Sequence, residues 1–356
     1  MKAILRSESY LKDSFEKFDK KIFYENWIYV GKESELLEEN SFLTKTIGEV
    51  PVVIQRLKGK IRAFKNICSH RHSIIQLDKC GVRPLICPYH GWTYSNEGEL
   101  VGVPKKPLFK FNEAELRCLR LKEFHVQSCG GLFFVHLAEN PDTLENYLGT
   151  FYNWLAEFGN NSSELIDTNT FRIEANWKVL VENTLESYHV ALVHSKTFQK
   201  LGTSGMNFQF DGKHSLWVTT LARGENDSTN KSIYQPFQNR TWIREGYEHL
   251  LIYPNLLLST TFGVSFNISI IEPLDSENSI FESRVYLASY DTNSALLESF
   301  KEILINFNRR VFEEDKAICE AVQKGMLVSH YEGQLSEEEL RVRAFQKMIL
   351  EDINGN

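Results

Sequence analysis

The first forty residues carry the spacing of apolar side chains that is typical of a helix. Four of these side chains recur at steps of three and four residues, which marks one helix face: Phe15, Phe18, Ile22 and Phe23. The segments W-I-Y-V-G and E-S-E-L-L-E-E-N follow in the same stretch. We therefore expect residues 1–40 to be helical.

From about residue 42 to residue 136 the pattern changes to short apolar runs separated by turn residues. The runs P-V-V-I-Q-R-L and I-R-A-F-K-N-I flank K-G-K, which predicts a β-hairpin. A second strand–turn–strand unit is predicted by L-I-C-P-Y-H-G and W-T-Y-S-N-E-G-E-L-V, and a closing strand by G-G-L-F-F-V-H-L. These runs indicate an all-β domain over residues 41–137.

From about residue 138 onward, helices alternate with an antiparallel sheet. The predicted helices cover residues 143–158, 178–194 and 294–324, and the charged run S-E-E-E-L-R-V-R-A-F-Q-K-M. The predicted strands cover residues 170–177, 249–259, 260–273 and 279–290. Residues 200–248 are rich in Gly, Asn and Ser, which predicts loops or lid-like segments. The whole pattern predicts an α+β fold, with the all-β domain inserted near the start of a larger domain made of residues 1–40 and 138–356.

Composition narrows the classes of partner. The chain has 356 residues, of which 42% are hydrophobic and 24% charged, so it can bury a substantial core in two domains. Its net charge of −7 argues against a nucleic-acid-binding role, because such binding needs a basic face. No apolar run approaches the length of a membrane span, and M-K-A-I-L-R-S-E-S has no signal-peptide core. We expect no membrane association and a cytoplasmic location.

Two short pairs of metal-ligating residues lie in the predicted all-β domain. Cys68 and His70 belong to N-I-C-S-H-R-H, and Cys87 and His90 to C-P-Y-H-G-W-T-Y. Two thiolates and two imidazoles can share a Rieske [2Fe-2S] cluster, with the Cys pair on one iron and the His pair on the other. The alternative is a structural zinc site, since Cys2His2 also binds zinc. Zinc fingers pair Cys with Cys and His with His, however, whereas each pair here is mixed, so the pattern favours the cluster.

Two further histidines, His189 and His194, lie in E-N-T-L-E-S-Y-H-V-A-L-V-H. On a straight helix they would lie about 140° apart. They can therefore bind one metal only if the helix is distorted by a bulge or if His194 lies past its end. Spacing alone favours two packed core histidines.

The motifs of this chain resemble the catalytic (alpha) subunit of Rieske-type non-haem iron oxygenases. The resemblance rests on F-Y-E-N-W-I-Y-V-G, G-K-I-R-A-F-K-N-I-C-S-H-R-H and C-P-Y-H-G-W-T-Y. It extends to the segments around His189 and Asp315 and so covers nearly the whole chain. It implies that residues 138–356 form a helix-grip-like catalytic domain with a second iron centre.

The resemblance also implies the ligands of this second centre. Two histidines and a distant Asp form the face that non-haem iron(II) oxygenases use. His189 and His194 match the family's histidines, and Asp315 in V-F-E-E-D-K-A-I-C-E matches its carboxylate. Local spacing cannot choose among the acids of that segment, and the other three are expected to form a solvated helix face: Glu313, Glu314 and Glu320.

Glu186, three residues before the first histidine, matches the family's bridging carboxylate, which is Asp in much of the family. By analogy it accepts hydrogen bonds from His189 of its own subunit and from His90 of a neighbouring subunit. The alternative is an exposed helix Glu paired with a Lys. A Glu at this position resembles the branch of choline and carnitine monooxygenases. The family also implies a head-to-tail homotrimer.

The resemblance implies a terminal oxygenase that uses a Rieske [2Fe-2S] cluster and mononuclear Fe(II) to activate O2. Electrons would come from NAD(P)H through a separate reductase or ferredoxin, because the chain has no G-x-G-x-x-G fingerprint. The reaction would hydroxylate or oxidatively demethylate a small organic molecule, either a quaternary amine or an aromatic or other apolar compound. A remoter alternative is an electron-transfer protein that holds the cluster alone.

Aromatic residues of the later strands and the long helix are candidates for a substrate pocket in either case. They could form a cage for a cation, although ordinary core packing is the simpler role for any one of them: Tyr253, Phe262, Phe266 and Phe307.

Overall fold

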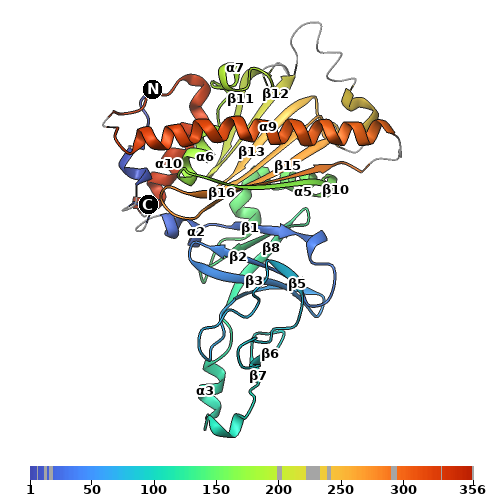
Figure 1. Cartoon of the computed structure of the whole chain (residues 1–356), viewed down its shortest axis with the longest axis vertical. Helices are drawn as coiled ribbons and strands as arrows, with labels where there is room; N and C mark the ends of the chain where they lie inside the picture. The colour runs from blue at the N-terminus through green and yellow to red at the C-terminus, as the bar shows by residue number, and fades with distance from the viewer. Residues whose placement is uncertain are drawn as a thin grey trace. The chain divides into compact units, whose positions relative to one another are not determined.

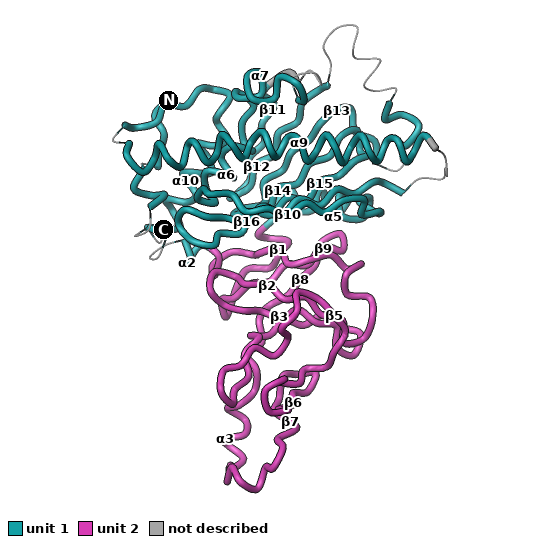
Figure 2. Tube along the Cα trace, in the orientation of Figure 1, with its two compact units in different colours: residues 1–22, 148–356 teal, residues 23–147 magenta. Residues whose placement is uncertain are grey.

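The computed structural model describes residues 1–5, 7–11, 14–15, 19–198, 203–221, 233–238, 242–289, 295–329 and 331–354. The chain divides into two compact units, residues 23–147 and residues 1–22 with 148–356 (Figure 2). Within the described residues, each unit is built on a seven-stranded antiparallel sheet. Together with the helices of the larger unit, residues 1–22 with 148–356, this confirms the α+β class.

The sheet of the unit 23–147 has the order β1-β9-β8-β4-β3-β2-β5, and a two-stranded ribbon, β6-β7, accompanies it. Its strands have these bounds: β1 Ile28–Lys32, β2 Ser41–Ile47, β3 Val50–Leu57, β4 Lys60–Lys65, β5 Cys80–Val82, β6 Thr93–Tyr94, β7 Leu100–Gly102, β8 Glu123–Cys129 and β9 Leu132–His136. The predicted hairpin is β3 and β4, which turn through Lys58 and Gly59, both with positive φ. A short helix, α3 (Glu113–Cys118), is the main helical element inside this unit.

Of the described residues in 1–40, the short elements Ser7–Tyr10, Lys20–Tyr24 and Glu33–Glu35 are helical, and the expectation of helix is wrong for the W-I-Y-V-G segment. From Ile28 to Lys32 the chain forms β1, all five of whose residues are buried, and β1 pairs with β9. Pairing with a strand more than a hundred residues away is invisible to a local pattern, and here it overrides local spacing. It also places residues 23–40 in the compact unit 23–147, whereas the sequence pattern groups them with the catalytic domain.

The sheet of the larger unit has the order β10-β16-β15-β14-β13-β12-β11. Its strands have these bounds: β10 Glu164–Ile173, β11 Thr203–Asp211, β12 His214–Leu221, β13 Gly246–Ile252, β14 Leu256–Thr261, β15 Ser265–Pro273 and β16 Ser279–Leu287. Strands β11 and β12 correct the expectation of loops over residues 200–248. The strand residues of β12 are largely buried and pair with β13, so tertiary pairing prevails over a polar composition. Residues 200–202, 222–232 and 239–241, also part of that expectation, lie outside the described residues.

The long helix α9 (Ala295–Met326) lies across the sheet of the larger unit (Figure 1). Leu297, Phe300 and Leu304 on its first turns pack with buried residues of the sheet. The remaining helices have these bounds: η1 Ser7–Tyr10, α2 Lys20–Tyr24, η3 Glu33–Glu35, η4 Lys106–Leu108, α4 Leu144–Leu148, η5 Gly149–Phe151, α5 Tyr152–Asn161, α6 Trp177–Thr184, α7 Val190–Val193, η8 Gln235–Phe237, η9 Glu337–Glu339 and α10 Leu340–Asn354. Among the described residues, no helix is long and apolar enough to cross a membrane.

Helix α6 is fixed in position by a buried polar network at its start. The Asn176 side chain caps the helix by accepting a hydrogen bond from the backbone N–H of Lys178, at 3.0 Å. The fully buried Lys178 ammonium pairs with the fully buried Asp19, which also accepts from Trp177 Nε1 at 2.8 Å. Removing one partner of a buried charge pair strongly destabilises the protein, because the other charge is left buried and unpaired. The pair therefore holds the start of α6 in this arrangement. The other end of α6 therefore reaches the functional site in a defined position.

Candidate active site and cluster site

The two candidate histidines lie at either end of a short helical turn, not on one continuous helix. Helix α6 ends at Thr184, and α7 (Val190–Val193) begins after a break. His189 precedes the first residue of α7, and His194 follows its last residue with φ −99° and ψ 31°. The single helix expected over residues 178–194 is therefore interrupted. Of the two geometries that allow a common metal, the structure has the one in which His194 lies past the helix end.

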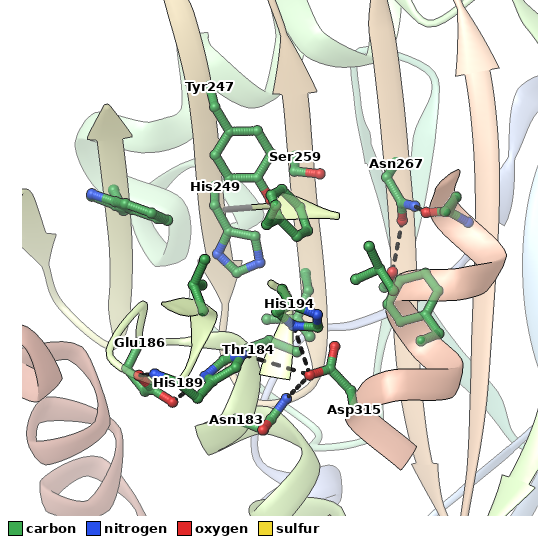
Figure 3. A pocket seen from close by; sticks show the side chains of 18 of the residues that line it. Asn183, Thr184, Glu186, His189, His194, Tyr247, His249, Ser259, Asn267 and Asp315 are labelled. Atoms are coloured by element: carbon green, nitrogen blue, oxygen red, sulfur yellow. Dashed lines mark hydrogen bonds and ion pairs between the residues drawn. The ribbon is translucent and has the colours of Figure 1, made fainter. Parts of the chain in front are cut away.

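The two imidazoles converge on the carboxylate of Asp315, which α9 brings from the far end of the sequence (Figure 3). Nε2 of His194 lies 3.0 Å from Asp315 Oδ1, and Nε2 of His189 lies 3.6 Å from the same oxygen. One ligand atom from each of the three residues lies within 4.8 Å of the others. Two imidazole nitrogens and one carboxylate oxygen on one side of a metal are the donor set of non-haem iron(II) oxygenases. The residues therefore fit such an ion.

Glu186 lies in the break between the two helices and contacts His189 twice. Its Oε2 accepts hydrogen bonds from the backbone N–H groups of Tyr188 and His189, the latter at 3.2 Å, which shapes the turn that starts α7. Its Oε1 contacts Nδ1 of the His189 ring. This contact directs Nε2 toward Asp315. The alternative of an exposed Glu paired with a Lys is wrong, since the Glu186 side chain is 12% exposed.

Glu314 makes the corresponding contact with the ring of His194. Sequence alone did not identify Glu314 as a residue of the site. Its Oε2 lies 2.8 Å from His194 Nδ1 and accepts a hydrogen bond from Thr197 Oγ1, also at 2.8 Å. Glu314 was expected on a solvated helix face, but its side chain is only 20% exposed. The signal available in the sequence was its position next to Asp315, because neighbouring residues of a helix lie about 100° apart and can both face one site.

Electrostatics of the site follow from these contacts. Burial lowers the pKa of His194, but the hydrogen bonds and charges of Asp315 and Glu314 outweigh it and raise the pKa above its usual value. Burial raises the pKa of Glu314, and its hydrogen bonds to His194 and Thr197 reverse the effect, so the net shift is downward. Asn183 Nδ2, also missed from sequence, donates to Asp315 Oδ1 at 2.9 Å and fixes that carboxylate.

The three converging residues open on a cavity of about 110 Å³ in the larger unit. Its walls are rich in aromatic side chains from the sheet, α9 and the segment after α7: Phe198, Trp217, Tyr247, Phe281, Phe307 and Phe312. Of the aromatic residues predicted from sequence, Phe307 lines this cavity and Phe266 lines a smaller one beside it. Tyr253 and Phe262 are buried in the core, as expected for most such residues.

The four predicted cluster residues lie on two similar loops of the unit 23–147. In the first loop the Cys68 N–H donates to Ser73 O at 2.8 Å, and in the second the Cys87 N–H donates to Trp92 O at 2.8 Å. The residue four places after each cysteine, His72 or Gly91, has φ near +60° to +72°. The two loops therefore have the same hydrogen bonds and the same left-handed residue.

Within these loops the sulfur and nitrogen ligands face different surroundings. Cys68 and Cys87 are buried in one hydrophobic cluster. The rings of His70 and His90 have centroids 4.7 Å apart, and His90 is exposed. Tyr94 OH donates to Cys68 Sγ at 3.2 Å. Buried thiols beside outward imidazoles fit a two-iron cluster with mixed ligation better than a single tetrahedral zinc.

Comparison with known proteins identifies the family. Residues 26–118 match the Rieske [2Fe-2S] domain, and residues 150–355 match the ring hydroxylating alpha subunit (catalytic domain). The chain belongs to the Rieske-type ring-hydroxylating alpha subunits. The catalytic match accounts for the residues that an electron carrier with the cluster alone would leave unexplained.

Curated relatives of this Rieske-type alpha subunit include monooxygenase components. The chain is 30% identical over 328 residues to the carnitine monooxygenase oxygenase subunit of Acinetobacter pittii, a match that covers 90% of the chain and 84% of that protein. It is 34% identical over 189 residues to the glycine betaine monooxygenase oxygenase subunit of Pseudomonas aeruginosa strain UCBPP-PA14. That match covers 52% of the chain and only 43% of the Pseudomonas protein.

A solved structure shows the same fold. The quaternary ammonium Rieske monooxygenase CntA, in complex with an inhibitor, matches with a TM-score of 0.80 at 22% identity. The match covers 98% of this chain and 95% of CntA. The Rieske-type alpha-subunit fold predicted from the motifs is therefore confirmed.

The contact between Glu314 and His194 yields a first prediction. Glu314→Ala should weaken iron binding at the catalytic centre by about 10- to 100-fold, because outer partners of this kind orient the ligand and raise its basicity. Metal analysis after dialysis against graded chelator measures the change. Glu313→Ala is the matched control, because Glu313 is exposed on the same helix. Equal iron retention in both variants would contradict a role for Glu314.

Proposed function

We propose that this chain is the terminal oxygenase component of a monooxygenase that acts on a small quaternary amine. It would receive electrons from NAD(P)H through a separate reductase or ferredoxin and would hydroxylate or oxidatively demethylate its substrate with O2. The observation that carries the proposal is the convergence of His189, His194 and Asp315 on the wall of an aromatic-lined cavity. The named relatives, a carnitine and a glycine betaine monooxygenase component, support the substrate class.

In this proposal His189, His194 and Asp315 hold the mononuclear iron, and Cys68, Cys87, His70 and His90 hold the [2Fe-2S] cluster. When bound, the cluster carries electrons and the iron supplies the redox chemistry of dioxygen activation. Glu186 and Glu314 accept from Nδ1 of the two histidines and so keep each Nε2 free to bind. We propose that the unit 23–147 is the cluster domain and that residues 1–22 with 148–356 are the catalytic domain, which moves residues 23–40, expected from sequence in the catalytic domain, to the cluster domain.

The aromatic wall of the cavity suits a cation without polar hydrogens. The Phe198 ring lies 5.3 Å from Phe307 and 5.8 Å from Tyr247, and Tyr247 lies 5.9 Å from Trp217, as centroid distances. Aromatic faces attract quaternary ammonium groups through their quadrupoles, and such a group offers no hydrogen-bond donor that a polar pocket could use. The rings therefore support binding of a trimethylammonium group near the metal-binding residues.

The substrate class can be tested by measuring oxygen uptake with a generic reductase. Glycine betaine, carnitine and choline represent the quaternary amines, and simple aromatic hydrocarbons represent the alternative. We expect oxygen uptake coupled to product formation with at least one quaternary amine and none with the hydrocarbons. Coupled turnover of the hydrocarbons alone would overturn the proposed class and leave the family assignment intact.

A head-to-tail homotrimer is part of the proposal, with Glu186 linking His189 to His90 of a neighbouring subunit. It predicts that two inactive variants complement each other. Asp315→Ala should lose the mononuclear iron and keep the cluster, whereas His90→Ala should lose the cluster and keep the iron. Neither should turn over alone, but oligomers refolded or co-expressed from both should regain turnover, because each supplies the site that the other lacks.

Adding Glu186→Gln to the His90→Ala subunit provides the control. The amide keeps the shape of the side chain and removes its charge, so the mixed oligomer should keep its iron and yet lose the regained turnover by orders of magnitude. Absence of any complementation, or a monomeric solution mass with full wild-type activity, would refute the intersubunit arrangement.

A further inference from the structure

The larger unit contains a buried cation without an acidic partner. Arg341 on α10 is 0% exposed. Its guanidinium donates to Ser215 Oγ at 3.0 Å, to Ser215 O at 2.9 Å and to His249 Nδ1 at 3.0 Å. Within the described part of the chain, none of these contacts is to a carboxylate. Burial lowers the pKa of Arg341 to about 9, which leaves it charged at neutral pH. A buried charge without a counter-charge is costly, which indicates a role beyond packing.

The contact with Arg341 fixes the protonation of His249. A guanidinium only donates hydrogen bonds, so His249 Nδ1 must be the acceptor and the ring proton must reside on Nε2. Burial, followed by the charge of Arg341, holds the pKa of His249 well below its usual value, so the ring stays neutral. His249 therefore has one defined tautomer with an Nε2–H donor.

The His249 donor is available to a ligand in the catalytic cavity. His249 is 7% exposed, and it lines the cavity together with the metal-binding residues. Figure 3 shows its ring beside Tyr247, on the strand β13 that forms this wall. Among the described residues, Arg341 is the only hydrogen-bond partner of the His249 ring. His249 thus offers a ring N–H that no other described residue uses, on a buried side chain that lines the cavity and is backed by a cation, and such a donor favours an anionic oxygen as its acceptor.

We propose that His249, polarised by Arg341, binds a carboxylate of the substrate, so that the substrate is a small carboxylic acid. This inference rests on the proposed function only for the other end of the substrate, the ammonium group, which the aromatic rings of the cavity would hold. Together the two ends select a zwitterion, such as glycine betaine or carnitine, over choline, which carries a hydroxyl in place of the carboxylate. His249 and Arg341 thereby act in binding and specificity and not in the chemical step.

The test is equilibrium binding by anaerobic calorimetry to the full-length protein loaded with cluster and iron. The ligands are glycine betaine, carnitine, choline and benzoate, of which benzoate carries a carboxylate without a cation. We expect whichever zwitterion binds better to bind at least about tenfold more tightly than choline. A charge-assisted hydrogen bond contributes enough binding free energy for a difference of this size. Equal affinity for choline and both zwitterions would overturn the inference.

Three substitutions of His249 separate recognition from structural support. His249→Phe keeps a ring and removes the donor, so the preference for the zwitterion over choline should disappear. His249→Gln can accept from Arg341 and donate to the cavity, and should restore most of the preference. His249→Glu gives Arg341 an acidic partner and faces the cavity with a negative charge, so it should fold and reverse the preference.

Ser215→Ala is the matched control, because it removes another hydrogen bond of Arg341 and leaves the one to His249. If Arg341 and His249 serve only to support the fold, Ser215→Ala and His249→Phe should lower the unfolding temperature alike and leave the ligand preference unchanged. That result would overturn the inference.

The outcomes also separate this inference from the proposed function. Tight binding of benzoate with no binding of either zwitterion would keep the carboxylate site and reject the quaternary amine. Turnover of quaternary amines without any preference for a carboxylate would keep the proposed function and reject the role of His249.

Discussion

The catalytic centre depends on one carboxylate approached by two imidazoles. Asp315 lies within 3.0 Å of His194 and 3.6 Å of His189, and each imidazole has its other nitrogen against a second acid. Asp315 lies between the two imidazoles, and Glu186 and Glu314 lie on their outer sides. The negative charge of these three carboxylates favours a bound cation. The break between α6 and α7, the fixed start of α6 and the length of α9 all serve to bring these groups together.

The two candidate metal sites are specified by the sequence in different ways. The cluster site is local, because each pair of ligands lies on one short loop and the two loops share the hydrogen bond that spans five residues. Spacing alone could therefore predict it. The catalytic centre joins residues more than a hundred positions apart, so the positions of His189 and His194 suggested a site without establishing one. Resemblance to a family, rather than spacing, singled out Asp315 among four acids.

What the sequence could not predict was decided by tertiary contacts. The segment around Tyr29 becomes a strand because β9 pairs with it, and β12 forms inside a stretch with loop-like composition because β13 does. Glu314 was expected to be exposed to solvent, because the residue pattern of its helix cannot show that the His194 ring packs against its carboxylate. His249 and Arg341 are separated by 92 positions, and only their hydrogen bond reveals which tautomer faces the cavity. Short segments of sequence were enough to predict the fold class and the cluster motif. The contacts that orient the ligands of the catalytic centre join distant residues and could not be predicted in this way.

The central claim is that one chain holds a two-iron cluster and a separate mononuclear iron. Quantification of metal and acid-labile sulfide in the purified protein, with EPR of the reduced sample, tests it most directly. We expect about three irons and about two sulfides per chain, with a Rieske-type signal. Zinc at the Cys68–His90 site without sulfide would contradict the cluster, and about two irons with two sulfides after anaerobic loading with Fe(II) would contradict the catalytic centre.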